Sequence, residues 1–231
     1  MPSLFITGTD TAVGKSLVTA GLAAFLRKQG IDCGVMKPVE SGCIPGSPQS
    51  DAYYLKSISG VHDALDEINC YTFKAALAPG IAARQERRNI SFSKIAKAYQ
   101  SLRAKHESML VEGAGGLMVP LVGKKNIADL IAYLKLPVLL VGRLGLGTLN
   151  HTLLSLEYLQ KRKIRVAGIV LNSHTAKLDE SAKSNLKILS EWTRVPIWGK
   201  VDYLENTQDK KSLIQAIRKG IGKPALEFVN R

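Results

Sequence analysis

A glycine-bounded loop near the amino terminus constrains the fold more than any other feature of this sequence. An apolar run ending at Thr7 leads into the loop Gly8–Ser16, and a helical pattern begins at Lys15. Glycine lets backbone N–H groups approach anionic oxygens, and the first turn of the following helix adds its positive end. The Lys15 amine and the Ser16 hydroxyl suit phosphates and Mg²⁺. The segment therefore predicts a strand, a phosphate-binding loop and a helix in succession.

The spacing within this loop is unusual. Gly8 and Gly14 enclose five residues, whereas the common form of the motif has four. An ordinary strand-to-helix turn that uses glycine for its backbone conformation is the alternative. The strand before, the helix after and the Lys-Ser pair favour phosphate binding, so the expected ligand is a nucleoside triphosphate.

Short apolar runs rich in β-branched residues alternate with longer helical patterns along all 231 residues. This alternation is typical of a parallel sheet covered by helices on both faces, and no linker interrupts it. It predicts an α/β fold with six or more parallel strands in a single domain over residues 1–231. Strands are expected at 4–7, 34–37, 109–112, 138–141, 166–171 and 197–200. Helices are expected from 15 to about 30 and at 50–58, 92–105, 127–134, 149–161, 179–192 and 208–219.

The net charge of +13 would suit nucleic acid, an acidic membrane surface or small anionic ligands. The basic residues form short dispersed groups without interleaved aromatic residues, which favours solvated helix ends over a nucleic-acid surface. The longest apolar segments, such as 136–142, are far shorter than the roughly 20 residues that cross a bilayer. We therefore expect neither a nucleic-acid partner nor a membrane.

The cysteines point to a reducing compartment. Cys33, Cys43 and Cys70 are odd in number and lack the paired spacing of a zinc or redox site. We interpret all three as reduced thiols and expect a cytoplasmic protein.

Polar residues follow several of the expected strands, at the edge where ligands bind in open parallel sheets. Lys37 follows the second strand, and a surface lysine with a buried stem is the alternative interpretation. Glu112 ends the third strand, at the position where a P-loop protein holds Mg²⁺. The residues expected to meet there are Gly8–Ser16, Lys37–Ser41, Glu112–Gly116, the 142–150 loop and Asn172.

Together these segments resemble the dethiobiotin synthetases, biotin-pathway ligases that close a cyclic urea on 7,8-diaminopelargonate using CO₂ and ATP. Thr7–Ser16, Lys37–Gly42 and Val111–Gly116 match the three family motifs. The segments 50–52 and 146–151 and the strand ending in Asn172 continue the resemblance, and only about the last thirty residues lack a distinctive match. The resemblance implies a P-loop fold of about seven mostly parallel strands, Mg²⁺ as the metal and a homodimer.

The resemblance also assigns roles by position. Lys15 and Lys37 would act as fixed cations at the phosphates and the substrate carbamate, with Thr11 beside them. A helix cap or a first-turn acid is the structural alternative for Asp51, and Asn150 equally fits a helix cap. The implied ligand sets are Thr11, Ala12, Val13, Gly14, Lys15, Ser16, Asn172, Val201, Asp202 and Tyr203 for ATP; Ser16, Asp51 and Glu112 for Mg²⁺; and Ser41, Gly113, Gly116, Leu146, Gly147 and Asn150 for the diamine. In the loop, the ATP set ends at Ser16 and does not extend to Leu17.

One departure and two rival classes qualify this interpretation. Some relatives place a tyrosine near Asn185 to hold the substrate carboxylate, so recognition of that group is open here. ATPase switches of the ParA or MinD type are the main alternative, but they carry an extra lysine early in the loop, where this chain has Asp10. The corrin-ring amidases also share the ATP-binding pattern, but they need a second, glutaminase domain.

Overall fold

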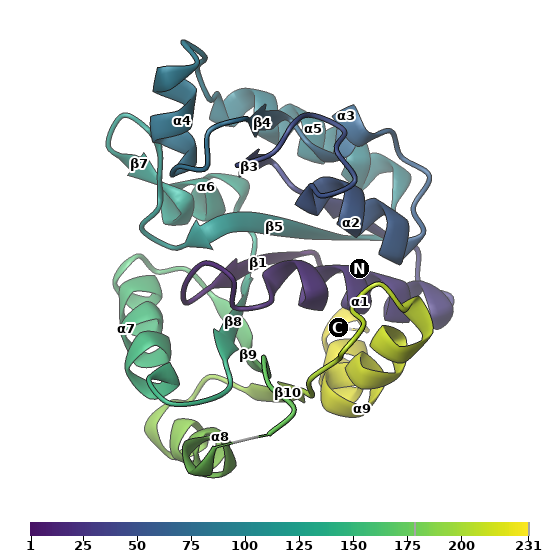
Figure 1. The fold of residues 1–231 in the computed structure, drawn as a ribbon, viewed down its shortest axis with the longest axis vertical. Helices are drawn as coiled ribbons and strands as arrows, with labels where there is room; N and C mark the ends of the chain where they lie inside the picture. Colours follow the sequence, from purple (N-terminus) through teal and green to yellow (C-terminus); the bar gives the residue numbers. More distant parts are fainter. Residues whose placement is uncertain (178, 231) are drawn as a thin grey trace.

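A computed structural model describes residues 1–177 and 179–230 (Figure 1). Its main sheet has six parallel strands in the order β10-β9-β8-β1-β5-β2. The α/β class and all six expected strand positions are confirmed, with six strands in this sheet where the family resemblance implied about seven. The strands are β1 (Leu4–Gly8), β2 (Cys33–Met36), β5 (Ser108–Gly116), β8 (Val138–Arg143), β9 (Val166–Asn172) and β10 (Ile197–Val201).

Helices cover both faces of this sheet, because its central strands bury side chains on both sides. In β1, Leu4 and Ile6 belong to one hydrophobic cluster, while Phe5 between them belongs to the other. The first cluster includes side chains of α1 (Lys15–Lys28), α2 (Asp51–Ser59), α3 (Leu65–Ile68) and α9 (Lys210–Val229). The second includes α4 (Pro79–Gln85), α5 (Phe92–Lys105), α6 (Ile127–Leu134), α7 (Thr148–Lys161) and α8 (Glu180–Trp192).

Several short elements were not expected from the sequence. A parallel pair joins β3 (Val39–Ser41) to β4 (Tyr71–Phe73), and an antiparallel pair joins β6 (Pro120–Val122) to β7 (Lys125–Asn126). The helices α3 and α4 were missed as well. Segments of two to seven residues carry too little periodicity to stand out against their surroundings.

The last helix is longer than the sequence predicted. The expected helix at 208–219 continues as α9 to Val229, with Pro224 inside it. Proline removes one backbone hydrogen bond, and this favoured an earlier end. The helix continues because Ile221, Ala225 and Phe228 lie at helical spacing and bury their side chains in the first cluster. Within the described residues no helix is both long enough and apolar enough to cross a membrane.

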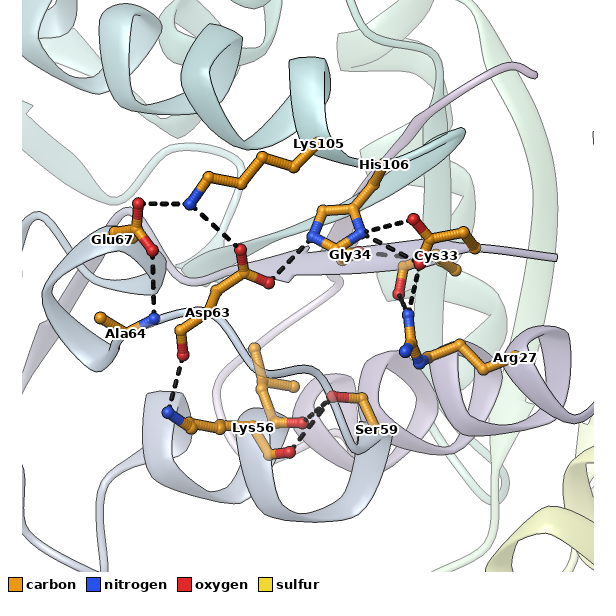
Figure 2. A network of polar contacts seen from close by, with 12 residues as sticks. Arg27, Cys33, Gly34, Lys56, Ser59, Asp63, Ala64, Glu67, Lys105 and His106 are labelled. Atoms are coloured by element: carbon orange, nitrogen blue, oxygen red, sulfur yellow. Dashed lines mark hydrogen bonds and ion pairs between the residues drawn. The ribbon is translucent and has the colours of Figure 1, made fainter.

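A group of charged side chains closes the amino edge of the sheet beside β2 and β5 (Figure 2). The His106 ring lies between two carboxylates, with Nδ1 3.0 Å from Asp32 Oδ2 and Nε2 2.9 Å from Asp63 Oδ2. Arg27 pairs with Asp32 at 2.5 Å, and Lys105 pairs with Asp63 at 3.5 Å. We call these five residues the amino-edge cluster. Its charges face one another and tie the end of α5 to β2 and to the loop after α2.

Candidate functional site

A cavity of about 800 Å³ lies at the opposite, carboxyl edge of the sheet. This volume is in the range of small-molecule sites, and the position is the one at which open α/β sheets bind ligands. Its wall combines the loops after β1, β5 and β9 with the residues around β3 and the segment after β10. Among the lining residues are Thr11, Ala12, Gly14, Lys15, Ser16, Leu17, Lys37, Glu40, Ser41, Asp51, Ala114, Gly115, Asn172, His174, Tyr203, Leu204 and Thr207.

The loop between β1 and α1 forms the floor of the cavity. Gly14 caps α1 with φ of 97°, and a Cβ atom there would lie 2.2 Å from Nδ2 of Asn172, so both conformation and space require glycine. Nζ of Lys15 donates to the carbonyl of Asp10 at 2.9 Å. Burial, followed by the nearby charge of Lys37, lowers the pKa of Lys15 to about 8. The first turn of α1 and a buried amine thus face the same space.

The lining of this floor continues one residue past the predicted ATP set. Leu17, which the sequence interpretation left out, lines the cavity directly after Ser16. Its side chain is partly buried against the first hydrophobic cluster. Leu17 was left out because the motif ends at Ser16 and a leucine in the first turn of a helix carries no phosphate-binding signal. The ATP set that ends at Ser16 stays a prediction.

Lys37 lies between two carboxylates in one wall of the cavity. Its Nζ is 2.7 Å from Asp51 Oδ2 and 2.5 Å from Glu112 Oε1. The side chains of Lys37 and Glu112 are 2% and 0% exposed. Burial opposes the charge of Lys37, but the two carboxylates outweigh it and hold its pKa above the usual value. Lys37 is therefore a fixed cation, and it is not the solvated surface lysine of the alternative interpretation.

Oxygen atoms beside Lys37 suit a hard divalent cation. Oγ of Ser16 lies 3.0 Å from Asp51 Oδ1 and 2.8 Å from Glu112 Oε1. The other carboxylate oxygen of Glu112, Oε2, is fully buried and has no hydrogen-bond partner among the described residues. In those residues no three His, Cys, Asp or Glu side chains form a metal cluster by themselves. The residues fit Mg²⁺ as a hydroxyl and two carboxylates that would share the ion with phosphate and water.

The start of α2 holds Asp51 in this group. Ser50 caps the helix by accepting from the Tyr53 N–H at 3.1 Å, so Asp51 is a first-turn residue and not the cap. Glu40 accepts from the Ala52 N–H at 3.3 Å and adds a second anchor. Burial raises the pKa of Glu40, and the positive field of Lys37 opposes this only in part. The sequence interpretation missed Glu40, although an acidic residue inside the Lys37–Gly42 motif was a usable signal.

Two further predicted polar side chains, those of Ser41 and Asn172, line the cavity. Oγ of Ser41 donates to the Leu77 carbonyl at 2.7 Å. Leu77 also lines the cavity, and the sequence interpretation did not include it. Nδ2 of Asn172 donates to the Val13 carbonyl at 3.3 Å, and its Oδ1 is fully buried without a partner among the described residues. Asn172 therefore retains an unused acceptor beside the loop.

Other predicted residues do not line the cavity. Val201 is fully buried, and Asp202 directs its carboxylate to Lys200 at 2.5 Å. Asn150 lies within the first turn of α7, because Gly147 caps that helix, so a capping role for Asn150 is wrong. Glu112 is also absent from the lining, because it lies fully buried behind Lys37. The remaining predicted residues away from the lining are Val13, Gly113, Gly116, Leu146 and Gly147, although the Gly113 carbonyl accepts from Lys37 at 3.3 Å.

Asn185, near which some relatives place a tyrosine, is buried beneath the loop that precedes α7. Its Nδ2 donates to the Gly145 carbonyl at 2.9 Å, and Asp179 accepts from the Leu146 N–H at 3.4 Å. Asn185 belongs to α8 and Asp179 caps that helix, so α8 holds the loop at two points. Asn185 thus supports the loop and does not point into the cavity described above.

The fold, the loop before α1 and the charged group around Lys37 define a P-loop nucleotide-binding protein. Residues 2–211 match the AAA domain family. The ATP-dependent dethiobiotin synthetase BioD of Anaeromyxobacter dehalogenans strain 2CP-1 is 47% identical over 193 residues, covering 84% of this chain and 86% of the relative. That of Bacillus subtilis strain 168 is 36% identical over 218 residues, covering 94% of each. The chain belongs to the ATP-dependent dethiobiotin synthetase family.

Solved structures of bacterial proteins share the architecture. The MinC:MinD cell division complex of Aquifex aeolicus gives a TM-score of 0.64 at 14% identity, covering 100% of this chain and 97% of that one. A ParA family ATPase from Chlorobium tepidum TLS gives 0.56 at 12% identity over 100% of both chains. Identities this low show the fold alone, so the proteins of the rival switch class are fold relatives.

Proposed function

We propose that this chain converts 7,8-diaminopelargonate, CO₂ and ATP to dethiobiotin, ADP and phosphate. Membership of the dethiobiotin synthetase family supports this reaction. The structural observation that carries the proposal is the position of Lys37, a buried cation between two carboxylates in the same cavity as the phosphate-binding loop. Phosphoryl transfer needs positioned charge more than it needs a protein nucleophile, and this wall supplies it.

The proposed sequence begins with a carbamate. One substrate amine adds to CO₂, and a carbamate oxygen then attacks the γ-phosphate with release of ADP. The second amine attacks the activated carbonyl carbon, displaces phosphate and closes the ring. Lys37 would contact the carbamate oxygens and the transferring phosphoryl group, and Lys15 the phosphates, because negative charge accumulates at both places. Thr11 and Ser41 would orient the amines by hydrogen bonds.

Ser16, Asp51 and Glu112 would hold the magnesium ion. A bound Mg²⁺ neutralises charge on the β- and γ-phosphate oxygens during transfer. The unpartnered Oε2 of Glu112 and the Oγ of Ser16 are the atoms that support this assignment.

The adenine base would lie beside Asn172 and Tyr203. Oδ1 of Asn172 is a buried acceptor without a partner among the described residues, and both residues line the cavity. An amide offers both a donor and an acceptor to a base edge.

A homodimer, a single domain over 1–231 and a cytoplasmic location complete the proposal. Leu146, next to Gly147 and Asn150, has 89% of its surface exposed and would reach the substrate tail of a second copy. The continuous six-stranded sheet supports one domain. The three cysteines are free thiols, which suits a reducing compartment.

The test uses purified protein with 7,8-diaminopelargonate, Mg²⁺, ATP and labelled bicarbonate. We expect acid-stable label in dethiobiotin and an equal amount of ADP. Boiled protein and a reaction without the diamine are the controls. Hydrolysis of ATP without labelled dethiobiotin would overturn the proposal.

A further inference from the structure

The wall at the base end of the cavity is an irregular segment between β10 and α9. Tyr203, Leu204 and Thr207 line the cavity, as does Asn172, which pairs with Val201 at the end of β10. The segment forms neither helix nor strand, so its position depends on contacts with other elements. Among the described residues, one hydrogen bond joins 203–208 to a separate element of the fold. Oη of Tyr54 donates to the Thr207 carbonyl at 2.8 Å.

Tyr54 belongs to the same helix as Asp51. That helix, α2, therefore contacts the charged group around Lys37 through Asp51 and the base-end wall through Tyr54. The Tyr54 ring is partly buried against the first hydrophobic cluster, and Leu204 packs against the same cluster. A Cβ atom at Gly60 would lie 2.8 Å from Nζ of Lys210, so the end of α2 also approaches the start of α9.

The Tyr54 hydroxyl is a dependable donor. Burial raises the pKa of Tyr54 to about 12, so the proton stays in place at neutral pH. A carbonyl fixed by a neutral, half-buried donor holds the backbone around it, because losing the bond would leave a polar group unpaired. Packing of the Tyr54 ring alone would restrain the segment sideways, but it would not fix how deep the Thr207 carbonyl lies.

The geometry points to Tyr54 as a positioning residue for nucleotide selection, whose hydroxyl sets the distance between the Tyr203–Thr207 wall and Asn172. This inference rests on the proposed function in one respect, namely that the base of ATP lies at this end of the cavity. Without the hydroxyl, the Tyr203–Thr207 wall is no longer held at a fixed distance from Asn172. A purine, which spans more of the gap than a pyrimidine, then loses more of its contact.

The experiment compares Tyr54→Phe with wild type in binding of non-hydrolysable analogues of ATP and CTP, with Mg²⁺ and without the diamine. Tyr54→Phe keeps the ring and removes one oxygen. We expect ATP-analogue affinity to fall about 2- to 10-fold, the size of one hydrogen bond, and the ATP-to-CTP affinity ratio to fall with it. Steady-state kcat at saturating ATP and KM for the diamine should not change.

Tyr53→Phe is the matched control, because Tyr53 is the neighbouring, exposed tyrosine of the same helix. It should leave the affinity ratio at the wild-type value. An unchanged ratio in Tyr54→Phe, with or without a lower melting temperature, would mean a structural role and would overturn the inference. So would a wild type that does not distinguish the two analogues. The wild-type product assay tests the reaction separately, so failure of the one does not imply failure of the other.

Discussion

Lysines and acidic residues gather at both edges of the main sheet, but their surroundings differ. At the amino edge, Lys105 is 46% exposed, and the carboxylate of Asp63 has two partners, His106 and Lys105. At the carboxyl edge, Lys37 is 2% exposed, and one oxygen of Glu112 has no partner among the described residues. The first group satisfies its own charges, as Figure 2 shows, whereas the second borders a cavity of about 800 Å³.

This difference separates structural charge from charge that is available for chemistry. The exposed ion pair of Lys105 with Glu67 contributes little to stability, because water screens it and the side chains lose freedom, whereas His106 and Asp63 are nearly buried. A buried cation with an unsatisfied neighbour is costly in the folded state, and such groups concentrate at functional sites. In the amino-edge cluster, the His106 ring packs against the backbone of β2, where a Cβ at Gly34 would lie 2.4 Å from the ring. We therefore expect substitutions at the two edges to affect different measurements.

The largest expected effect is on turnover by Lys37→Ala. Removing one positioned charge from a developing transition state lowers kcat by about 10²- to 10³-fold. The KM for ATP should change far less, because Lys15 and the loop backbone remain. Lys105→Ala is the control from the amino edge and should keep wild-type kcat. Steady-state kinetics with both variants decide the matter, and equal rates in the two would contradict the comparison.

The sequence predicted the parts of this contrast that depend on local pattern. The six main strands contain short apolar runs, and Lys37 and Glu112 each end or follow one of them, so their meeting at one edge followed from parallel topology. The contacts of Tyr54 with Thr207 and of His106 with Asp63 join residues 153 and 43 positions apart without any motif. No periodicity encodes such pairs. They depend on how α2 and α5 dock, which tertiary packing decides.

A second prediction concerns magnesium. Glu112→Gln removes the negative charge next to Ser16 while keeping the side-chain volume. The Mg²⁺ concentration for half-maximal rate should rise by about tenfold or more, as for other groups that tune a metal site. Titration of the rate with Mg²⁺ at fixed ATP measures this. Glu67→Gln, which changes an acid paired with Lys105, should give the wild-type curve. A wild-type curve from Glu112→Gln would point to another ligand.

The third prediction moves to stability at the amino edge. His106→Ala removes the ring nitrogens that face Asp32 and Asp63 and leaves the nearly buried Asp63 carboxylate with Lys105 alone. The free energy of unfolding should fall by about 1–3 kcal/mol, the cost of an unsatisfied buried acceptor. Urea unfolding measures it, with exposed His62→Ala as the control. The variant should keep wild-type kcat. A lower kcat in fully folded His106→Ala protein would contradict the assignment of a purely structural role to the amino edge.

The smallest expected effect is on the free energy of unfolding at low pH. Burial opposes ionisation of Asp32, but the hydrogen bonds and charges of His106 and Arg27 outweigh it and hold the pKa below the usual value. A depressed carboxyl pKa adds stability that is complete above the unfolded-state pKa of about 3.9 and is lost as pH falls through the folded-state pKa. Asp32→Asn lacks this term, so its unfolding free energy should fall less steeply than that of wild type below about pH 4. Urea unfolding at several pH values gives the slope of unfolding free energy against pH for each protein. Only the difference between the two slopes reports on Asp32, because other carboxyls titrate in the same range. Parallel slopes would show that solvent screens Asp32, whose side chain is 42% exposed, from its partners in the amino-edge cluster.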